Sequence, residues 1–163
     1  MTTQTDRPIN QLITGGRTAF ITTENGIFHE DEGLKTQSTK INETEAAVVA
    51  ELIAALFEVY DENGKKLSPN SIGIIAPYRN QIAVIRRELQ HRRIVGVDEI
   101  MVETVERFQG SQREIIVLSF CVNEPGQLDF LCNLNREGTV DRKLNVAMTR
   151  ARQQLFLVGN ARI

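Results

Sequence analysis

Residues 72–76 read IGIIA, a continuous apolar run without polar alternation, and this stretch decides the fold class. Such a run is typical of a strand that is covered on both faces of a parallel sheet. Pro77 ends the run, and apolar residues at helical spacing then predict a helix over residues 78–91. A buried strand followed directly by an amphipathic helix is the repeating unit of an α/β domain.

The same alternation continues on both sides of this unit. Asn42 begins the clearest helix, in which Glu45 completes a capping-box-like pair, and the Asn63-Gly64 pair ends it. Apolar runs predict strands over residues 18–22, 100–104, 115–120 and 155–158, and helical spacing predicts a last helix over 142–152. We therefore predict an α/β three-layer sandwich, with a mostly parallel sheet of about five strands and helices on both faces.

Two segments lie outside these elements. Residues 1–17 are polar and are expected to form a flexible lead-in, so the domain itself is expected over residues 18–163. Residues 24–40 are charged and irregular, which predicts a surface loop.

Composition limits the classes of function. The 163 residues suit one domain, and 19 basic against 21 acidic residues give a net charge of −2. This balance excludes a whole-surface electrostatic grip on nucleic acid but allows a local basic patch. No apolar run approaches the ~20 residues that cross a bilayer, and the polar start lacks the apolar stretch of a signal peptide. We expect a cytoplasmic protein without membrane contact, in which Cys121 and Cys132 are buried or free thiols.

Three loops of the predicted sheet carry unusual residues, and in such sheets function lies in loops beyond the carboxyl ends of the strands. These loops cover residues 77–81, 104–114 and 120–141. In the first, Tyr78 is suited either to stacking on a base or to packing in the core. The second reads TVERFQGSQ over residues 104–112 and is either a simple turn or a binding loop. Its Gly110 suits close backbone approach, and its Thr and Gln side chains offer neutral hydrogen bonds.

The predicted helix over residues 142–152 reads RKLNVAMTRAR and is amphipathic. Its apolar face holds Leu144, Ala147, Met148 and Ala151. Its polar side carries Arg142, Asn145, Thr149 and Arg150. This side is either a solvated basic surface or a set of guanidinium groups held for bidentate binding of a polyphosphate.

Three other stretches suggest sites that we reject. Residues 95–99 read VGVDE, but the run is too short for a strand that presents Mg²⁺ ligands. Residues 15–18 read GGRT, which lacks the lysine of a phosphate loop. His29 stands beside three acids in a stretch that is typical of a solvated loop. We predict no metal site in this chain.

Taken in order, four stretches resemble the second RecA-like domain of superfamily 1 helicases, in the group that contains the nonsense-mediated-decay helicase. They are INETEAAVV (41–49), IGIIAPYRNQ (72–81), VETVERFQGSQREIIVLS (102–119) and RKLNVAMTRARQQLFLVGN (142–160). They correspond to the helix before motif IV and to motifs IV, V and VI of that family. The resemblance runs from about residue 18 to the end of the chain and implies the RecA-like fold of the P-loop NTPases.

The resemblance implies roles for residues toward ATP. Arg150 matches the arginine that reaches the γ-phosphate, and Arg142 matches a residue that supports either the same phosphate or its partner acid. Gln109 and Gly110 match the turn between the two motor domains. The family usually has Glu, which binds the ribose, where this chain has Gln112. An amide still bonds a hydroxyl, but without charge.

The resemblance also implies a track for single-stranded DNA or RNA. Thr104 matches a residue that contacts the nucleic-acid backbone. Pro77, Tyr78 and Gln81 match the motif IV region beside it. The expected function is the C-terminal motor domain of an ATP-dependent helicase.

The sequence lacks a phosphate-loop lysine and a convincing Mg²⁺-holding acid pair. Phosphoryl transfer needs both groups, so we expect the 163 residues alone to be inactive. The expected cofactors are ATP and Mg²⁺, with the Mg²⁺ ligands on an N-terminal RecA-like domain of the same parent protein. The alternative is a non-catalytic RecA-like module that binds nucleic acid or a protein.

Overall fold

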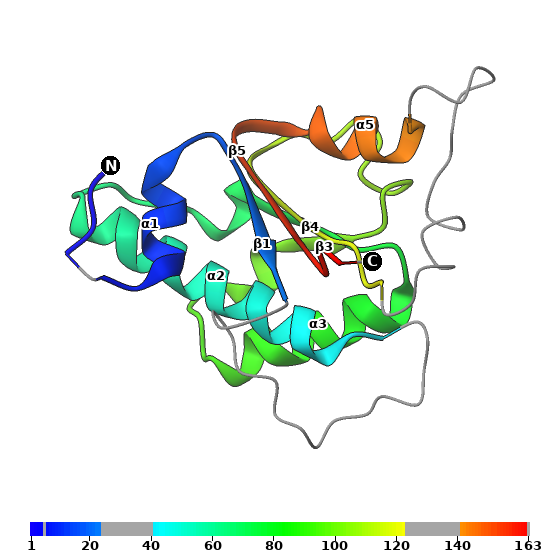
Figure 1. Cartoon of the computed structure of the whole chain (residues 1–163), viewed down its shortest axis with the longest axis horizontal. Coiled ribbons are helices and arrows are strands. Elements are labelled where there is room, and N and C mark those ends of the chain that lie inside the picture. The colour runs from blue at the N-terminus through cyan, green and yellow to red at the C-terminus, as the bar shows by residue number, and fades with distance from the viewer. Residues whose placement is uncertain (5, 24–40, 123–140, 163) are drawn as a thin grey trace.

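Five parallel strands form one sheet in the order β1-β5-β4-β2-β3 (Figure 1). The computed structural model describes residues 1–4, 6–23, 41–122 and 141–162. The strands are β1 (Thr18–Thr22), β2 (Ile72–Ile75), β3 (Met101–Glu103), β4 (Arg113–Ser119) and β5 (Ala151–Gly159). All carboxyl ends therefore lie at one edge of the sheet, the carboxyl edge, and all amino ends lie at the opposite amino edge. The predicted α/β fold is confirmed.

Helices cover both faces of the sheet (Figure 1). The helices are α1 (Pro8–Gly15), α2 (Glu43–Glu62), α3 (Arg79–His91) and α5 (Arg142–Met148). Short 3₁₀ turns span Pro69–Ser71 and Val97–Glu99. The first three helices pack on one face, and α5 packs on the other. None of the described helices has the length and apolar content that crossing a membrane requires.

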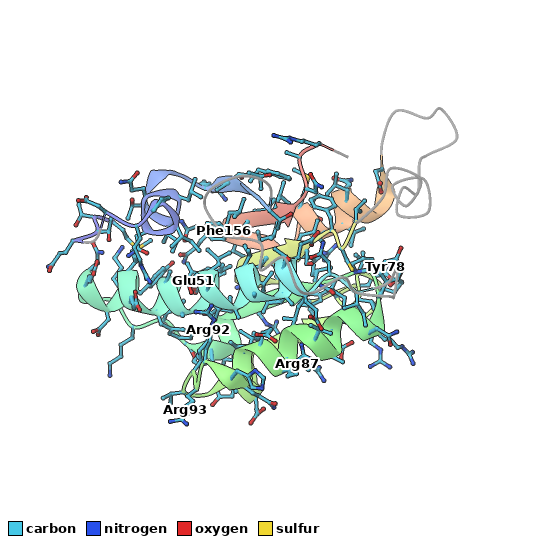
Figure 2. The ribbon with its side chains drawn as sticks, turned by 60° about the horizontal axis from the view of Figure 1, so that its bottom comes forward. Glu51, Tyr78, Arg87, Arg92, Arg93 and Phe156 are labelled. Atoms are coloured by element: carbon cyan, nitrogen blue, oxygen red, sulfur yellow. The ribbon has the colours of Figure 1, made fainter. Side chains whose placement is uncertain are left out.

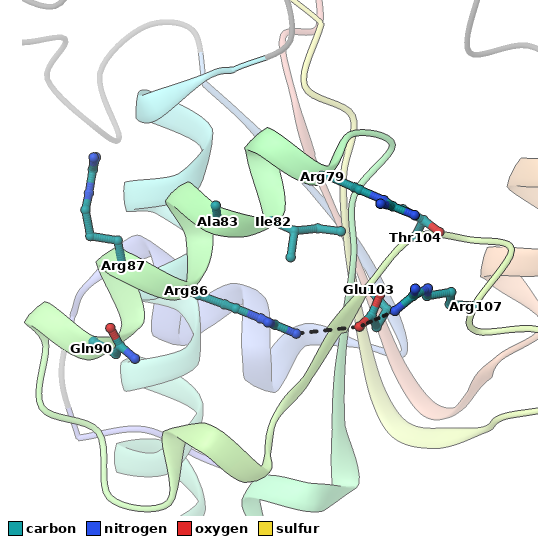
Figure 3. A pocket seen from close by; sticks show the side chains of 9 residues that line it. All are labelled: Arg79, Ile82, Ala83, Arg86, Arg87, Gln90, Glu103, Thr104 and Arg107. Atoms are coloured by element: carbon teal, nitrogen blue, oxygen red, sulfur yellow. Dashed lines mark ion pairs between the residues drawn. The ribbon is translucent and has the colours of Figure 1, made fainter.

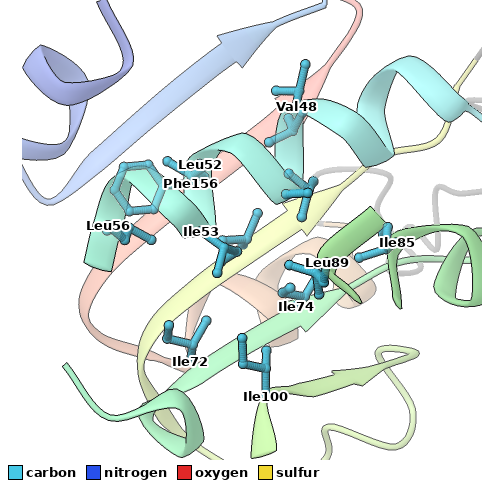
Figure 4. Close-up of a cluster of buried hydrophobic side chains, with 14 of the residues drawn as sticks. Val48, Leu52, Ile53, Leu56, Ile72, Ile74, Ile85, Leu89, Ile100 and Phe156 are labelled. Atoms are coloured by element: carbon cyan, nitrogen blue, oxygen red, sulfur yellow. The ribbon is translucent and has the colours of Figure 1, made fainter. Parts of the chain in front are cut away.

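The larger core lies between the sheet and the pair α2 and α3 (Figure 4). Leu52 and Leu56 of α2 and Leu89 of α3 are almost fully buried there, together with Ile74 of β2 and Phe156 of β5. Ion pairs bind the outer surfaces of the same helices together. Glu51 of α2 forms an ion pair with Arg92, which follows α3 (Figure 2). It forms a second ion pair with Arg7, which precedes α1.

A smaller core lies on the other face, under α5 and the loop after β3. Phe108 of that loop is fully buried against β2 and β4. A Cβ on Gly73 would lie 2.8 Å from the Phe108 ring, so the glycine in the IGIIA strand makes room for this side chain. The loop is thereby anchored across the face of the sheet.

The capping prediction for α2 is confirmed at its main contact. The Asn42 side chain accepts a hydrogen bond from the Glu45 backbone N–H at 2.8 Å, and Asn63 is the C-cap. Gly64 follows with a φ of +64°, a conformation that glycine adopts without strain. The predicted loop over residues 24–40 lies outside the described residues, and so does most of the loop over 120–141.

The flexible lead-in predicted for residues 1–17 is wrong, because Pro8–Gly15 forms α1. Ile9 and Ile13 of this helix are buried in the larger core. The Gln154 side chain of β5 donates to the Ile13 carbonyl at 2.8 Å and to the Gly16 carbonyl at 3.1 Å. A helix this short takes its stability from packing rather than from its own sequence, so periodicity gives little signal.

The helix predicted over residues 142–152 is also too long, because α5 ends at Met148. The Arg150 N–H bonds the Ala147 carbonyl in a turn, and β5 begins at Ala151, four residues before the predicted strand. Pairing of Ala151 with Arg113 of β4 takes the chain out of the helix. Met148, predicted to face inward, is 45% exposed.

Candidate functional site

The pairing of β4 with β5 brings the candidate ATP-binding residues together at the amino edge. Gln112 directly precedes β4, and Arg150 directly precedes β5. The Arg113 N–H donates to the Arg150 carbonyl at 3.0 Å, and Arg152 Nε donates to the Gln112 side-chain oxygen at 3.1 Å. The predicted position at the carboxyl edge is thus wrong for these residues. The connections that lead to Gln112 and Arg150 both start at the carboxyl edge. The chain then crosses the face of the sheet before it reaches these two residues at the amino edge.

The Arg150 guanidinium lies against the last turn of α5. Its Nε donates to the Val146 carbonyl at 3.2 Å, and the residue is half-buried. The structure shows no ion pair for Arg150 with any residue in the described ranges. Arg142 is the first residue of α5, and the placement of its side chain lies outside the description.

Gly110 forms the turn that leads into this edge. It has a φ of +84°, and, its two chain neighbours aside, no heavy atom of the described residues lies within 4 Å of the position of an added Cβ. Its backbone conformation therefore favours glycine, while its surface is open to another molecule. The adjacent Gln109 is exposed.

Thr104, Pro77 and Tyr78 lie at the carboxyl edge. Thr104 follows β3, and the other two residues follow β2, which is hydrogen-bonded to β3. Tyr78 is half-buried at the N-cap of α3, and burial raises the pKa of its hydroxyl. These three residues therefore follow two neighbouring strands, at the opposite edge from Arg150.

Gln81 is fully buried, which argues against its predicted contact with nucleic acid. Its side-chain oxygen accepts from the Asn42 N–H at 2.8 Å, and its amide nitrogen donates to the Asn42 carbonyl at 2.9 Å. A second donation reaches Ser119 Oγ at 3.4 Å. Gln81 therefore joins the first turn of α3 to the start of α2.

Glu45 is a fully buried carboxyl whose hydrogen bonds beyond the helix cap were not predicted from the sequence. Its Oε2 accepts from Ser119 Oγ at 2.7 Å and from the Cys121 N–H at 2.8 Å. Burial raises its pKa from the ordinary 4.5 to about 7, although these hydrogen bonds oppose the rise. Burial also raises the pKa of the Cys121 thiol to about 12, so this cysteine stays protonated. The signal in the sequence was that Glu45 shares the helical row of Val49 and Leu52.

A groove between α3 and the end of β3 is the second feature that the sequence did not predict (Figure 3). We call it the arginine groove. Its volume is about 410 Å³, and its lining comprises Arg79, Ile82, Ala83, Arg86, Arg87, Gln90, Glu103, Thr104 and Arg107. The signal was the recurrence of arginine on one face of α3. In the described part of the chain, no three His, Cys, Asp or Glu side chains converge as metal ligands.

Helicases from several organisms are similar in sequence to most of this chain. A putative helicase MOV-10-B.1 of Danio rerio is 32% identical over 148 residues, and the DNA polymerase alpha-associated DNA helicase A of Saccharomyces cerevisiae is 33% identical over 147. These alignments cover 83% and 84% of this chain but only 14% and 19% of those proteins. The DNA replication ATP-dependent helicase/nuclease DNA2 of Bos taurus is 44% identical over 112 residues, which is 68% of this chain and 9% of that protein.

A solved structure, the C-terminal domain of a possible DNA helicase from Lactobacillus plantarum, aligns with a TM-score of 0.47 and 16% identity over 74% of this chain and 69% of that one. The sequence family described as AAA domain matches residues 3–162, almost the whole chain. The chain therefore belongs to the AAA domain family, and over most of its length it is related to superfamily 1 helicases.

Proposed function

We propose that this chain is the C-terminal motor domain of an ATP-dependent helicase and supplies Arg150 to an ATP site shared with a second RecA-like domain. The observation that carries the proposal is the amino-edge arrangement, in which β4–β5 pairing sets Arg150 beside Gln112 and Arg152. Guanidinium and amide groups on a rigid sheet edge are suited to a triphosphate and a sugar hydroxyl.

These residues fit one side of ATP and not the other. ATP, when bound, supplies a γ-phosphoryl group on which negative charge develops during transfer to water. Arg150 would neutralise that charge, and Gln112 would hydrogen-bond the ribose without contributing charge. The chain has no G-x-x-x-x-G-K-[ST] sequence, and the described residues hold no acidic cluster for Mg²⁺. We therefore place the phosphate loop and the Mg²⁺ ligands on the other domain.

The carboxyl edge would carry the nucleic-acid strand. Thr104 offers a hydroxyl to a backbone phosphate, and Pro77 and Tyr78 lie at the end of the neighbouring strand. Closure and opening of the cleft between the two domains during hydrolysis would then move the strand past this edge. Contacts to the backbone carry no base information, so sequence preference should be slight.

The test is Arg150→Ala in the polypeptide that carries both this chain and the phosphate loop. We expect nucleic-acid-stimulated ATP hydrolysis to fall by roughly 10³–10⁵-fold, the range for a removed arginine finger. Arg150→Lys should restore little, because an ammonium lacks the planar fork. The melting temperature should hardly change, since the described contact of the Arg150 side chain is a single part-buried hydrogen bond to the Val146 carbonyl of the preceding helix α5.

Arg93→Ala is the matched control, because Arg93 is exposed and follows α3 at the opposite end of the helix from Tyr78 (Figure 2). It should hydrolyse ATP at the parent rate. If Arg150→Ala also retains the parent rate, Arg150 is not the arginine finger. The chain is then better described as a RecA-like binding module.

A further inference from the structure

Positive charge gathers in the arginine groove although the whole chain is acidic. Four arginines and one carboxylate line the groove, whereas the chain as a whole has a net charge of −2. Arg79 and Arg86 extend from α3 toward the end of β3, and Arg107 faces them from the loop after β3, whereas the Arg87 side chain points away from them (Figure 3). A concave surface of one charge concentrates ligands of the opposite charge.

Glu103 occupies the position that an external anion would take. Its Oε1 lies 3.6 Å from Arg86 Nη2 and also 3.6 Å from Arg107 Nη1. Both distances exceed the roughly 2.7–2.9 Å of a good charge-assisted hydrogen bond. The two arginine side chains are 55% and 63% exposed, and ion pairs at such exposure contribute little to stability. A phosphate oxygen can therefore replace the carboxylate at small cost.

The side chain of Arg79 extends toward Thr104 in the groove (Figure 3). The structure gives Arg79 no ion pair with any residue of the described ranges. Arg87, by contrast, is engaged by Glu43 at 3.4 Å and by Glu88 at 3.2 Å. The arginines that remain available to an anionic ligand are therefore Arg79, beside Thr104, and the pair Arg86 and Arg107 around Glu103.

The edge of the sheet beside the groove is closed to another strand of protein. Arg86 Nη2 donates to the Val102 carbonyl of the edge strand β3 at 3.0 Å. This bond occupies a carbonyl that an added peptide strand would use. A neighbouring hollow that shares Arg86 and Gln90 contains Asp98, so the positive surface ends there. The groove is suited to a short run of phosphates rather than to a β-strand.

We propose that the arginine groove is a second phosphodiester-binding surface, which continues the single-strand track from Thr104 along α3, and that Glu103 limits its affinity. The proposal rests on the proposed function, because it assumes that a single strand reaches Thr104. Glu103 stands where a phosphate would stand, so removing its charge should strengthen binding. Removing the arginines should weaken it.

The experiment measures binding of fluorescein-labelled oligothymidylate and oligouridylate to the 163-residue chain by anisotropy over a salt series. Arg79→Gln combined with Arg107→Gln should weaken binding and reduce the slope of log K against log salt by about 1.4, which is about 0.7 for each phosphate that the protein no longer neutralises. Glu103→Gln should tighten binding about fivefold at low salt, the effect of one unit charge at about 4 Å in water. Melting curves confirm that each variant is folded.

The matched control variants make the same changes of charge at residues outside the arginine groove. Arg93→Gln removes a cation beyond the end of α3, and Glu62→Gln removes an acid at the last residue of α2. Both should bind like the parent chain. If these controls shift binding as much as the groove variants do, only net charge matters and the groove proposal is overturned.

Thr104→Val separates this inference from the proposed function. If Thr104→Val weakens binding and the groove variants do not, the groove proposal fails and the Thr104 track stands. If the groove variants weaken binding and Thr104→Val does not, the groove proposal stands and the Thr104 contact fails.

If the parent chain binds neither oligonucleotide at low salt, both proposals fail. If polyglutamate competes as well as the oligonucleotides at equal charge, the groove is a surface for acidic proteins, which also overturns the proposal.

Discussion

Glu45 shows how a single buried carboxyl connects the start of a helix to the end of a strand. Its Oε2 accepts hydrogen bonds from the Ser119 hydroxyl and the Cys121 N–H. Its Oε1 accepts a hydrogen bond at 3.3 Å from the side-chain amide of Asn42, the helix cap. The pKa of about 7 means that the folded protein keeps a proton which the unfolded chain has lost above pH 4.5. The free energy of unfolding therefore falls as pH rises from 4.5 to about 7.

We predict that Glu45→Gln removes this pH dependence. The shift from 4.5 to about 7 corresponds to about 3 kcal/mol of stability lost over that interval, and an amide cannot ionise. The amide oxygen can still accept from Ser119 and Cys121. Urea unfolding at several pH values measures the effect, with the surface variant Glu62→Gln retaining the parent profile. If Glu45→Gln loses as much stability as the parent between pH 4.5 and about 7, groups other than Glu45 cause the pH dependence.

At the scale of elements, α5 differs most from its sequence pattern. The pattern placed Ala147 and Met148 on the same inward face, but only Ala147 is buried, at 1% exposure. The helix ends at Met148 and the chain enters β5 three residues later. Sheet pairing at this point overrides the local periodicity.

We predict opposite outcomes for two neighbouring substitutions in α5. Ala147→Asp buries an unpaired charge and should destabilise the domain by several kcal/mol, about 3 or more. Met148→Asp changes an exposed side chain and should cost no more than about 1 kcal/mol. Urea unfolding of both variants decides between these outcomes. Equal, large losses would mean that Met148 packs inward after all.

The strands and the two long helices could be predicted because their signals are local. The IGIIA run, the apolar β4 and the Asn42 cap each identify an element without knowledge of its neighbours. Other features depend on contacts between distant segments. Helix α1 depends on packing, the burial of Gln81 depends on Asn42, and the groove forms only when α3 meets the end of β3. The motif residues were identified by resemblance, but only the sheet shows that they lie at two opposite edges.

At the scale of the whole molecule, one loop connects the two edges. It leaves β3 at Thr104, passes Phe108 in the smaller core, and reaches Gln112 at the start of β4. The proposed strand contact and the proposed nucleotide contact are therefore the two ends of one anchored segment. Under the proposed function, this segment would transmit a change at the nucleotide to the nucleic-acid strand.

The most direct test of the shared ATP site is ATP hydrolysis by the 163 residues alone and by the same chain joined to a phosphate-loop RecA-like domain, each with Mg²⁺ and single-stranded nucleic acid. We predict no turnover above background for the chain alone, because it holds only the arginine side of the site. In the joined polypeptide we predict turnover that nucleic acid stimulates. Turnover by the chain alone that disappears when Mg²⁺ is chelated would contradict the half-site and would make Asp98 and Glu99 the metal site.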